Sequence, residues 1–375
     1  MKILLIGNQS NTIILFRKNF IKLMIQKKII VHTLTMDFNK GNFERIKSLG
    51  AHPEQYKFSR SGINPISDII NTIRLSKKIK EINPDIVLCF FPKPIIFGSI
   101  ASKIAQVTKI YSLFEGLGYT FTETNNRINI KKTIIKKLQI LLYKISLPLS
   151  NKVLFLNKDD QNEIISNHKV FVKTSSVIGG IGVDINEFTY TPISSTRKIH
   201  FSMVSRLLVE KGVREFIEAA KIVKQDYPFV EFSIAGSVDD NPGGITSTEL
   251  ELWQRENIVT FKGQISNIKD FLIDSSVFVL PSYREGVPRS TQEAMAIGRA
   301  ILTTDVPGCR DTVIDGYNGF LVPPYNSKAL ANKMIQFLNN PDLLNSMGLA
   351  SRKLAVERFD ENVFCERLLE ILTSS

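Results

Sequence analysis

The chain alternates short apolar runs with amphipathic segments of helical period. In the first half, the apolar runs that read as buried strands span residues 3–6, 31–34, 86–90, 110–114, 153–156 and 176–178. Between them lie segments such as 66–82 and 95–105, whose apolar residues recur at helical spacing. Strands alternating with helices predict an α/β domain with a parallel sheet covered on both faces. In such a sheet, ligands bind outside the carboxyl ends of the strands.

The second half repeats this alternation. Its expected strands span residues 200–204, 230–235, 258–261, 277–280, 300–303 and 320–322, and helical runs follow at 326–338, 341–357 and 362–372. A chain of 375 residues is long for one hydrophobic core. We therefore expect two domains, residues 1–190 and 191–358, followed by a C-terminal helix over residues 359–375.

The stretch from residue 277 to residue 308 carries the most informative chemistry. It reads as a strand, a loop containing Glu285, a helix containing Glu293, and a second strand. The free N–H groups and the dipole of a helix start favour an anion such as a diphosphate. A carboxylate on each side suits a ligand with hydroxyls at both ends of that diphosphate, which describes a nucleotide-sugar. Alternatively, Glu285 caps a turn and Glu293 is an ordinary solvated helix residue.

Two further loops of the second half follow expected strands. Arg206 and Lys211 bracket a turn that ends in Gly212, before a helix. A bidentate guanidinium and a mobile ammonium at such a place would form a diphosphate clamp, although basic surface loops are common. The loop that opens with Gly236 follows the next strand and would flank the same site.

The first half offers three polar side chains near expected strand ends. Lys93 follows the third strand, Glu115 follows the fourth, and Arg17 lies in the helix that opens near Thr12. Gly116 would allow a backbone to approach a ligand closely beside Glu115. The alternative is a tight turn with an exposed glutamate. The first loop lacks the G-x-G-x-x-G pattern and a Walker A lysine, which argues against an NAD enzyme.

The positive charge of the chain lies in its first half. Residues 1–190 contain 28 Lys and Arg against 13 Asp and Glu, a net charge of +15, whereas the remainder carries −3. The first half should therefore face an anionic partner. Nucleic acid is not expected, because no aromatic-interleaved basic motif or helix-turn-helix pattern is found. A membrane surface or a diphosphate substrate fits better.

One segment of the first half, residues 127–147, is a basic amphipathic helix. Its charges include Lys131, Lys132, Lys136 and Lys137, and no acidic residue interrupts it. Such a helix can lie in an anionic membrane interface with its apolar side down. An ordinary helix that faces the core and exposes its lysines fits the pattern equally well.

Other classes of protein are disfavoured by composition. The three cysteines lie far apart, and the four histidines show no ligand spacing, so neither a disulfide framework nor a metal site is expected. The N-terminus lacks a signal-peptide pattern and no apolar run reaches the length of a membrane span. We expect a cytoplasmic location.

These motifs together resemble the retaining family 4 (group 1) glycosyltransferases of GT-B fold. Arg206 and Lys211 in VSRLLVEKGV look like the family's phosphate-binding pair, and Glu285 and Glu293 in PSYREGVPRSTQEAMAIG look like its E-x7-E motif. Further segments are most similar to bacterial enzymes that add N-acetylhexosamines, such as N-acetylgalactosamine, or related sugars to polyprenyl-diphosphate-linked saccharides. The segments are FR at 16–17, NPISDIINTIRLSKKIKEINPDIV, EGLG at 115–118 and GGIGVDINEF.

The resemblance implies two Rossmann-like domains that face across a cleft, with the acceptor on the first, the nucleotide on the second and a terminal helix crossing back. It implies that Glu293 binds the ribose hydroxyls, that Glu285 binds the donor sugar, and that Arg206 and Lys211 hold the diphosphate. The implied catalytic residues are Glu285, Arg206, Lys211 and Glu115. The implied donor contacts also include Gly236, Gly286, Val287, Pro288, Arg289 and Ser290, and the implied acceptor contacts are Arg17, Lys93, Glu115, Gly116 and Gly118.

The expected activity is therefore retaining sugar transfer from a nucleoside-diphosphate-sugar, by analogy UDP-linked, to a polyprenyl-diphosphate-linked saccharide in O-antigen, capsule or glycan assembly. No metal cofactor is expected, because Arg206 and Lys211 already supply positive charge. The protein would act at the inner face of the cell membrane as a peripheral protein. The alternatives are a nucleotide-sugar hydrolysing epimerase of the same fold and a non-catalytic scaffold that binds sugar-nucleotides or membranes.

Overall fold

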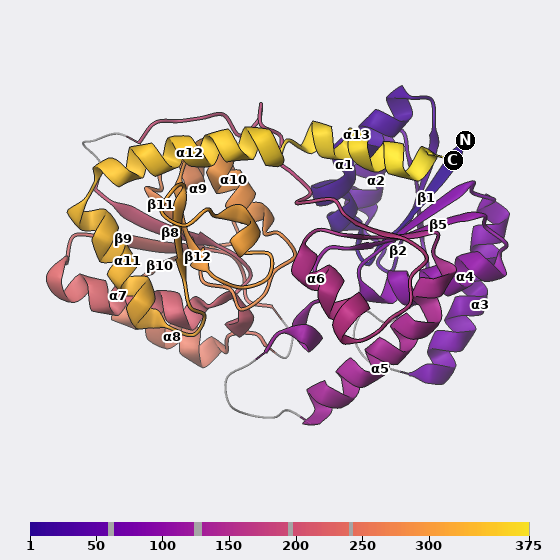
Figure 1. Ribbon diagram of the computed structural model, residues 1–375, viewed down its shortest axis with the longest axis horizontal. Helices are drawn as coiled ribbons and strands as arrows, with labels where there is room; N and C mark the ends of the chain where they lie inside the picture. The colour runs from indigo at the N-terminus through magenta and orange to yellow at the C-terminus, as the bar shows by residue number, and fades with distance from the viewer. Residues whose placement is uncertain (59–63, 124–129, 194–197, 240–242, 375) are drawn as a thin grey trace. The chain divides into compact units, whose positions relative to one another are not determined.

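The computed structural model describes residues 1–58, 64–123, 130–193, 198–239 and 243–374. The first residues of the expected basic helix, 127–129, lie outside this set. The chain divides into two compact units (Figure 1). The first unit comprises residues 1–117, 129–181 and 361–375, and the second comprises 118–128 and 182–360.

The first unit is built on a parallel sheet of seven strands among the described residues, in the order β3-β2-β1-β4-β5-β6-β7. The strands are β1 (Lys2–Ile6), β2 (Ile30–Thr35), β3 (His52–Gln55), β4 (Ile86–Phe90), β5 (Lys109–Phe114), β6 (Lys152–Phe155) and β7 (Ser175–Val177). The central strands β1, β4 and β5 are almost wholly buried, as expected for a sheet covered on both faces.

Helices cover both faces of this sheet (Figure 1). They are α1 (Ser10–Gln26), α2 (Lys40–Ser48), α3 (Pro65–Ile82), α4 (Ser99–Ile104), α5 (Ile130–Ser146), α6 (Lys158–Asn162) and α13 (Glu361–Thr373), with short turns η1 (Pro94–Gly98), η3 (Leu147–Leu149) and η4 (Glu163–Asn167). The C-terminal helix α13 packs on α1, where Asn19 donates a hydrogen bond to Glu361 at 3.1 Å.

The second unit has a parallel sheet of six strands among the described residues, in the order β10-β9-β8-β11-β12-β13. The strands are β8 (His200–Val204), β9 (Glu231–Ala235), β10 (Thr260–Gly263), β11 (Val277–Leu280), β12 (Ala300–Thr304) and β13 (Gly319–Val322). The helices are α7 (Val213–Asp226), α8 (Ser247–Glu256), α9 (Ile268–Ile273), α10 (Arg289–Ile297), α11 (Ser327–Asn339) and α12 (Asp342–Arg358), with turns η2 (Tyr119–Phe121), η5 (Val209–Lys211) and η6 (Arg310–Thr312).

The structure confirms the expected strands and the alternation of strands with helices. The sequence pattern missed one strand, β3, whose four residues HPEQ contain no apolar run. This strand lies at the edge of the sheet and pairs only with β2 among the described residues, so just one of its residues is buried. Edge strands need less apolar surface, which explains why hydrophobicity did not reveal it.

Candidate active site

The candidate donor site lies where the strand order of the second sheet reverses. Strands β9 and β10 extend to one side of β8, whereas β11, β12 and β13 extend to the other. The loops that leave the carboxyl ends of β8 and β11 are therefore neighbours, which is the usual ligand position in an open parallel sheet. Gly212 shows how close they are, because a Cβ on it would lie 2.1 Å from the Pro281 carbonyl oxygen.

This arrangement brings Lys211 and Glu285 into direct contact. The Lys211 Nζ atom lies 2.6 Å from Glu285 Oε1, and the side chains are 17% and 12% exposed. The same carboxylate oxygen accepts a hydrogen bond of 2.7 Å from Ser282 Oγ, and the Glu285 amide donates to the Pro307 carbonyl at 3.0 Å. Hydrogen bonds thus hold both the backbone amide and the carboxylate of Glu285, and Lys211 places a positive charge beside that carboxylate.

Arg206 lies on the other side of the loop after β8. Its Nη1 atom lies 2.6 Å from Asp239 Oδ2 in the loop after β9, and its side chain is half exposed. The two loops meet at Gly236, because a Cβ there would lie 1.7 Å from the Ser205 carbonyl oxygen. Arg206 therefore contacts an acid of a neighbouring loop, whereas Lys211 contacts Glu285.

The helix that follows Glu285, α10, presents its N-terminus at the same sheet edge. In the part of the chain that the structure describes, no side chain caps this N-terminus, where Pro288 occupies the N-cap position. Ser290 in the first turn is half-buried, and Gly286 and Val287 before the helix are buried. An uncapped N-terminus with its N–H groups and positive dipole end favours an anionic ligand.

Glu293, one turn into α10, is mostly buried and pairs with Arg289. The Arg289 Nε atom lies 3.1 Å from Glu293 Oε1, and the Glu293 side chain is 10% exposed. The alternative interpretation of Glu293 as an ordinary solvated helix residue is therefore wrong. Since burial of a carboxylate needs a partner, Arg289 is the residue that stabilises Glu293 there.

Several residues of this site were not singled out by the sequence pattern. Gln292 is fully buried; its Oε1 accepts a hydrogen bond from the Gly182 amide at 2.9 Å and its Nε2 donates to the Val287 carbonyl at 3.0 Å. Tyr283 Oη donates to Glu215 Oε1 at 2.8 Å, and burial together with Glu215 raises the pKa of Tyr283. Both anchor the loop around Glu285, and neither carries a recognisable local signal.

Cys309 also lies near Glu285. Burial, with the nearby Glu285 charge, raises the pKa of its thiol to about 12. The thiol is therefore protonated at neutral pH and is no nucleophile.

In the first unit, the structure brings together Arg17 and Glu115. Arg17 projects from α1 and Glu115 follows β5, and the two form an ion pair in which their side chains are 1% and 7% exposed. The Arg17 guanidinium carbon also lies 4.7 Å from the centre of the Phe90 ring, a cation–π contact. Glu115 is thus not the exposed residue of a tight turn, because it neutralises a buried arginine.

Lys93 does not join this pair. Its Nζ atom lies 3.9 Å from Asp68 Oδ1 of α3, and burial lowers its pKa, an effect that Asp68 opposes. Phe91, two residues before Lys93, has a φ of 73°. A positive φ strains the backbone of a residue other than glycine. Gly116 (φ 110°) and Gly118 (φ 76°) adopt left-handed conformations, and Gly118 belongs to the second unit.

The basic helix is α5, and much of its apolar side is exposed. Ile130, Ile134, Leu141 and Ile145 are each more than half exposed, whereas Leu138 and Leu142 are half-buried, and Tyr143 and Ser146 are buried. Lys131 and Lys137 are exposed, Lys132 is half-buried, and Lys136 pairs with Glu163 at 3.0 Å. The interpretation of α5 as an ordinary core-facing helix therefore accounts for only part of its apolar side. Among the described residues, none of the helices has the length and apolar character that a membrane crossing requires.

Both halves of the chain match families of known proteins. Residues 189–354 match the model described as glycosyl transferases group 1, and residues 2–155 match the model described as glycosyl transferase 4-like. The chain is 29% identical over 340 residues to the N,N'-diacetylbacillosaminyl-diphospho-undecaprenol alpha-1,3-N-acetylgalactosaminyltransferase of Campylobacter jejuni, covering 88% of this chain and 87% of that protein. It is also 27% identical over 312 residues to the UDP-Gal:alpha-D-GlcNAc-diphosphoundecaprenol alpha-1,3-galactosyltransferase of Escherichia coli, covering 80% of this chain and 77% of that protein.

Solved structures agree with this assignment at the level of the fold. Anabaena HepE, solved in complex with UDP and glucose, superimposes with a TM-score of 0.79 at 18% identity, covering 100% of both chains. A sucrose-phosphate synthase from Thermosynechococcus elongatus does so with a TM-score of 0.77 at 17% identity, covering 99% of this chain and 98% of that one. The chain is therefore a glycosyltransferase of GT-B fold, with a glycosyl transferase 4-like domain in its first half and a glycosyl transferases group 1 domain in its second half.

Proposed function

We propose that this glycosyltransferase moves an N-acetylhexosamine or a related sugar from a UDP-sugar to a polyprenyl-diphosphate-linked saccharide, with retention of anomeric configuration. The observation that carries the proposal is the contact between Lys211 and Glu285 beside the N-terminus of α10. The Campylobacter jejuni and Escherichia coli relatives support the acceptor, because both are named for transfer to a sugar on diphosphoundecaprenol.

The donor half of the proposal follows from charge. Cleavage of the bond to the anomeric carbon leaves negative charge on the diphosphate and positive charge on the sugar ring. Lys211, Arg206 and the α10 N–H groups stabilise the diphosphate without a metal ion, and the Glu285 carboxylate orients the sugar and stabilises the positive ring. In a front-face attack, the leaving phosphate takes the proton of the acceptor hydroxyl. Glu293 binds the ribose hydroxyls in this proposal, with Arg289 holding it in place.

The acceptor half of the proposal rests on the first unit. Its +15 charge over residues 1–190 suits a diphosphate-linked acceptor at an anionic surface. Glu115, held by Arg17, positions the acceptor saccharide, and Lys93 contacts its diphosphate. The exposed apolar side of α5, flanked by Lys131 and Lys137, rests on the inner membrane surface. The protein is peripheral to the membrane in this proposal.

An assay of the purified protein tests this proposal. A panel of UDP- and GDP-sugars is offered with a polyprenyl-diphosphate-linked saccharide, and product is followed for the wild type and Glu285→Gln. We expect turnover of one UDP-N-acetylhexosamine, an α-linked product by NMR, and loss of about 100-fold or more in the variant, which lacks the charge facing the sugar ring.

Three outcomes contradict the proposal in different ways. Consumption of the nucleotide-sugar without acceptor would indicate a hydrolysing epimerase. Binding of the nucleotide without turnover of any donor would indicate a scaffold. A β-linked product from an α-linked donor would exclude retention.

A further inference from the structure

The N-terminal half of helix α3 in the first unit exposes its isoleucines and buries polar residues, whereas its C-terminal half buries Leu75, Ile79 and Ile82. Its first two turns bury Asp68, Asn71 and Thr72. The isoleucines of the same turns point outward: Ile66 is 73% exposed, Ile69 61%, Ile70 44% and Ile73 48%. An amphipathic helix on the surface of a water-soluble domain shows the opposite arrangement. Within the described part of the chain, the isoleucines of these turns therefore lack a covering partner.

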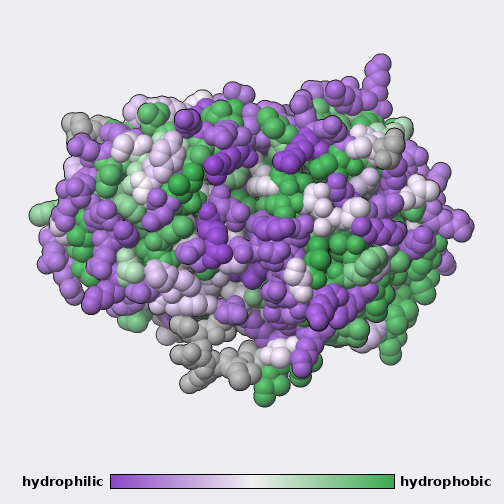
Figure 2. All heavy atoms as spheres, in the orientation of Figure 1, coloured by the Kyte–Doolittle hydropathy of each residue, from purple (hydrophilic) through white to green (hydrophobic). Residues whose placement is uncertain are grey.

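The exposed isoleucines form one continuous row. Positions 66, 69, 70 and 73 have the spacing i, i+3, i+4 and i+7, which places them on one side of a helix. Figure 2 shows hydrophobic side chains gathered over the N-terminal part of α3, at the lower right of the view. Isolated exposed apolar residues are common on proteins, but a contiguous row marks an interaction surface.

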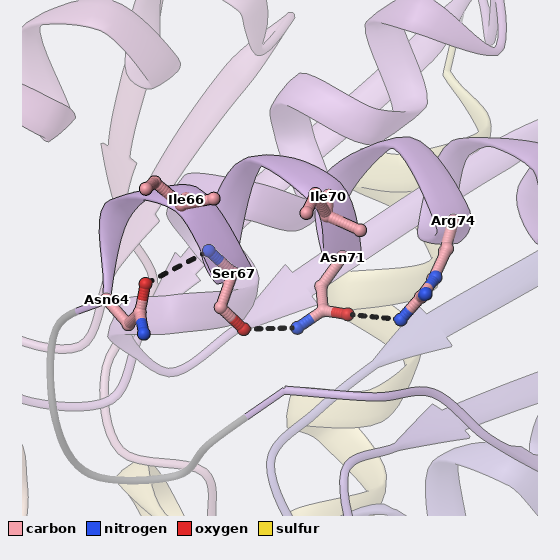
Figure 3. Close-up of a pocket in the computed structure, with 6 residues that line it drawn as sticks. All are labelled: Asn64, Ile66, Ser67, Ile70, Asn71 and Arg74. Carbon is pink, nitrogen blue, oxygen red and sulfur yellow. Dashed lines mark hydrogen bonds between the residues drawn. The ribbon is translucent and has the colours of Figure 1, made fainter.

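Polar and cationic groups flank this row. A hollow of about 340 Å³ is lined by Asn64, Ser67, Asn71 and Arg74 together with Ile66 and Ile70. Figure 3 shows these polar side chains as a hydrogen-bonded row, with Ile66 and Ile70 on the other side of the helix: Asn64 Oδ1 accepts from the Ser67 amide at 3.1 Å, and Arg74 Nη1 donates to Asn71 Oδ1 at 3.3 Å.

Cations outnumber acids on the exposed side of α3. Arg74, Lys77 and Lys80 are exposed; of the two acids of this helix, Asp68 is buried and Glu81, in the last turn, is exposed. An apolar row followed by exposed cations matches the interface of an anionic bilayer, whose acyl boundary accepts isoleucine and whose headgroups attract arginine and lysine.

Helix α3 also lies on the same flank of the sheet as α5. Both helices pack against η1. Each exposes apolar residues among cations, so the two helices offer parts of one basic, apolar flank of the first unit.

We infer that the outer face of α3, formed by Ile66, Ile69, Ile70, Ile73 and Arg74, docks on an anionic phospholipid surface. This inference rests on the proposed function, because a polyprenyl-linked acceptor lies in such a surface. Docking through α3 would hold the first unit at the membrane independently of the lysines of α5.

Vesicle sedimentation of the full chain tests this inference. The vesicles are phosphatidylcholine alone or phosphatidylcholine with about one third phosphatidylglycerol, whose surface charge attracts basic residues. The test variant replaces Ile66, Ile69, Ile70 and Ile73 with serine. A matched control replaces four residues of the second unit with similar exposure (42–58%) by serine: Leu252, Ile314, Leu349 and Val356.

We expect the test variant to lose at least about tenfold in partition to the anionic vesicles, since each isoleucine contributes apolar area, and the control to partition like the wild type. A second variant, Arg74→Gln with Lys77→Gln and Lys80→Gln, should lose at least about fivefold of its preference for anionic over neutral vesicles. Circular dichroism and thermal melting confirm that each variant is folded.

Wild-type partition by the test variant would overturn the inference, and so would an equal loss in the control. A change from dimer to monomer in sedimentation equilibrium, with unchanged vesicle binding, would show that a second copy of the chain covers α3 instead.

An activity assay with a short-chain, water-soluble acceptor distinguishes failure of this inference from failure of the proposed function. The test variant should keep wild-type kcat/KM there, whereas absence of transfer by the wild type refutes the proposed function and leaves the vesicle result standing.

Discussion

The contact between Lys211 and Glu285 makes the sharpest prediction about catalysis. In Lys211→Met, the side chain keeps much of its volume but loses the ammonium that lies 2.6 Å from Glu285 Oε1. Two effects follow: in the proposed reaction the leaving diphosphate loses a positive charge, and the Glu285 carboxylate keeps the hydrogen bond from Ser282. Because the charge on the diphosphate grows in the transition state, kcat should fall more than KM rises.

The size of the expected fall in kcat can be taken from other active sites that lose one preorganised charged or hydrogen-bonding group. Removal of such a group from an active site costs about 3–4 kcal/mol, or about 100- to 1,000-fold in kcat. The effect on folding should be smaller. The two side chains are 17% and 12% exposed, so solvent partly screens the pair, and we expect Lys211→Met to change the free energy of unfolding by about 1–2 kcal/mol.

Steady-state kinetics with the preferred donor measures the first effect, and urea unfolding measures the second. Lys221→Met is a matched control, because Lys221 in the same unit pairs with Glu256 at 2.9 Å on the surface, away from the strand ends. The control should keep wild-type kcat. A loss of less than about threefold in Lys211→Met, with the donor KM unchanged, would refute the role of Lys211 at the diphosphate.

Three further predictions concern stability. Arg17→Met should destabilise the first unit by about 3 kcal/mol in urea unfolding, because it leaves the buried Glu115 carboxylate without its cation. Arg17→Lys should recover part of the lost stability. An unchanged urea midpoint in Arg17→Met would contradict the buried pair. Glu163 has a pKa lowered to about 2, since its hydrogen bonds and the neighbouring cations outweigh burial, so the stability that it contributes is present above about pH 4.5 and is lost as the pH falls toward 2. Glu163→Gln should therefore flatten the fall of the melting temperature over that window, and a profile as steep as that of the wild type would argue against this contribution. Gly212→Ala should lower both the melting temperature and donor affinity, because the residue has a φ of 73° and its Cβ would lie 2.1 Å from the Pro281 carbonyl oxygen; wild-type values in calorimetry would contradict the close approach of the two loops.

The fold class and the positions of the candidate donor-site residues could be predicted from the sequence. Buried parallel strands are continuous apolar runs, so all the described strands of both sheets except β3 could be recognised one by one. The positions of Arg206, Lys211, Glu285 and Glu293 after these strands could be recognised too, since a motif and its place along the chain are local properties. Sequence could not reveal β3, because an edge strand requires little apolar surface.

Which side chains meet and which surfaces remain open depends on tertiary packing, which the sequence pattern does not show. The contact of Lys211 with Glu285 joins residues 74 positions apart, and it depends on the neighbouring places of β8 and β11 in the sheet. The pairing of Arg17 with Glu115 likewise depends on long-range packing. The isoleucines of α3 have the spacing of an ordinary core-facing helix, and periodicity cannot tell which side of a helix is covered. The covered side is fixed by the packing of neighbouring elements, and here that packing buries Asp68 and exposes Ile66.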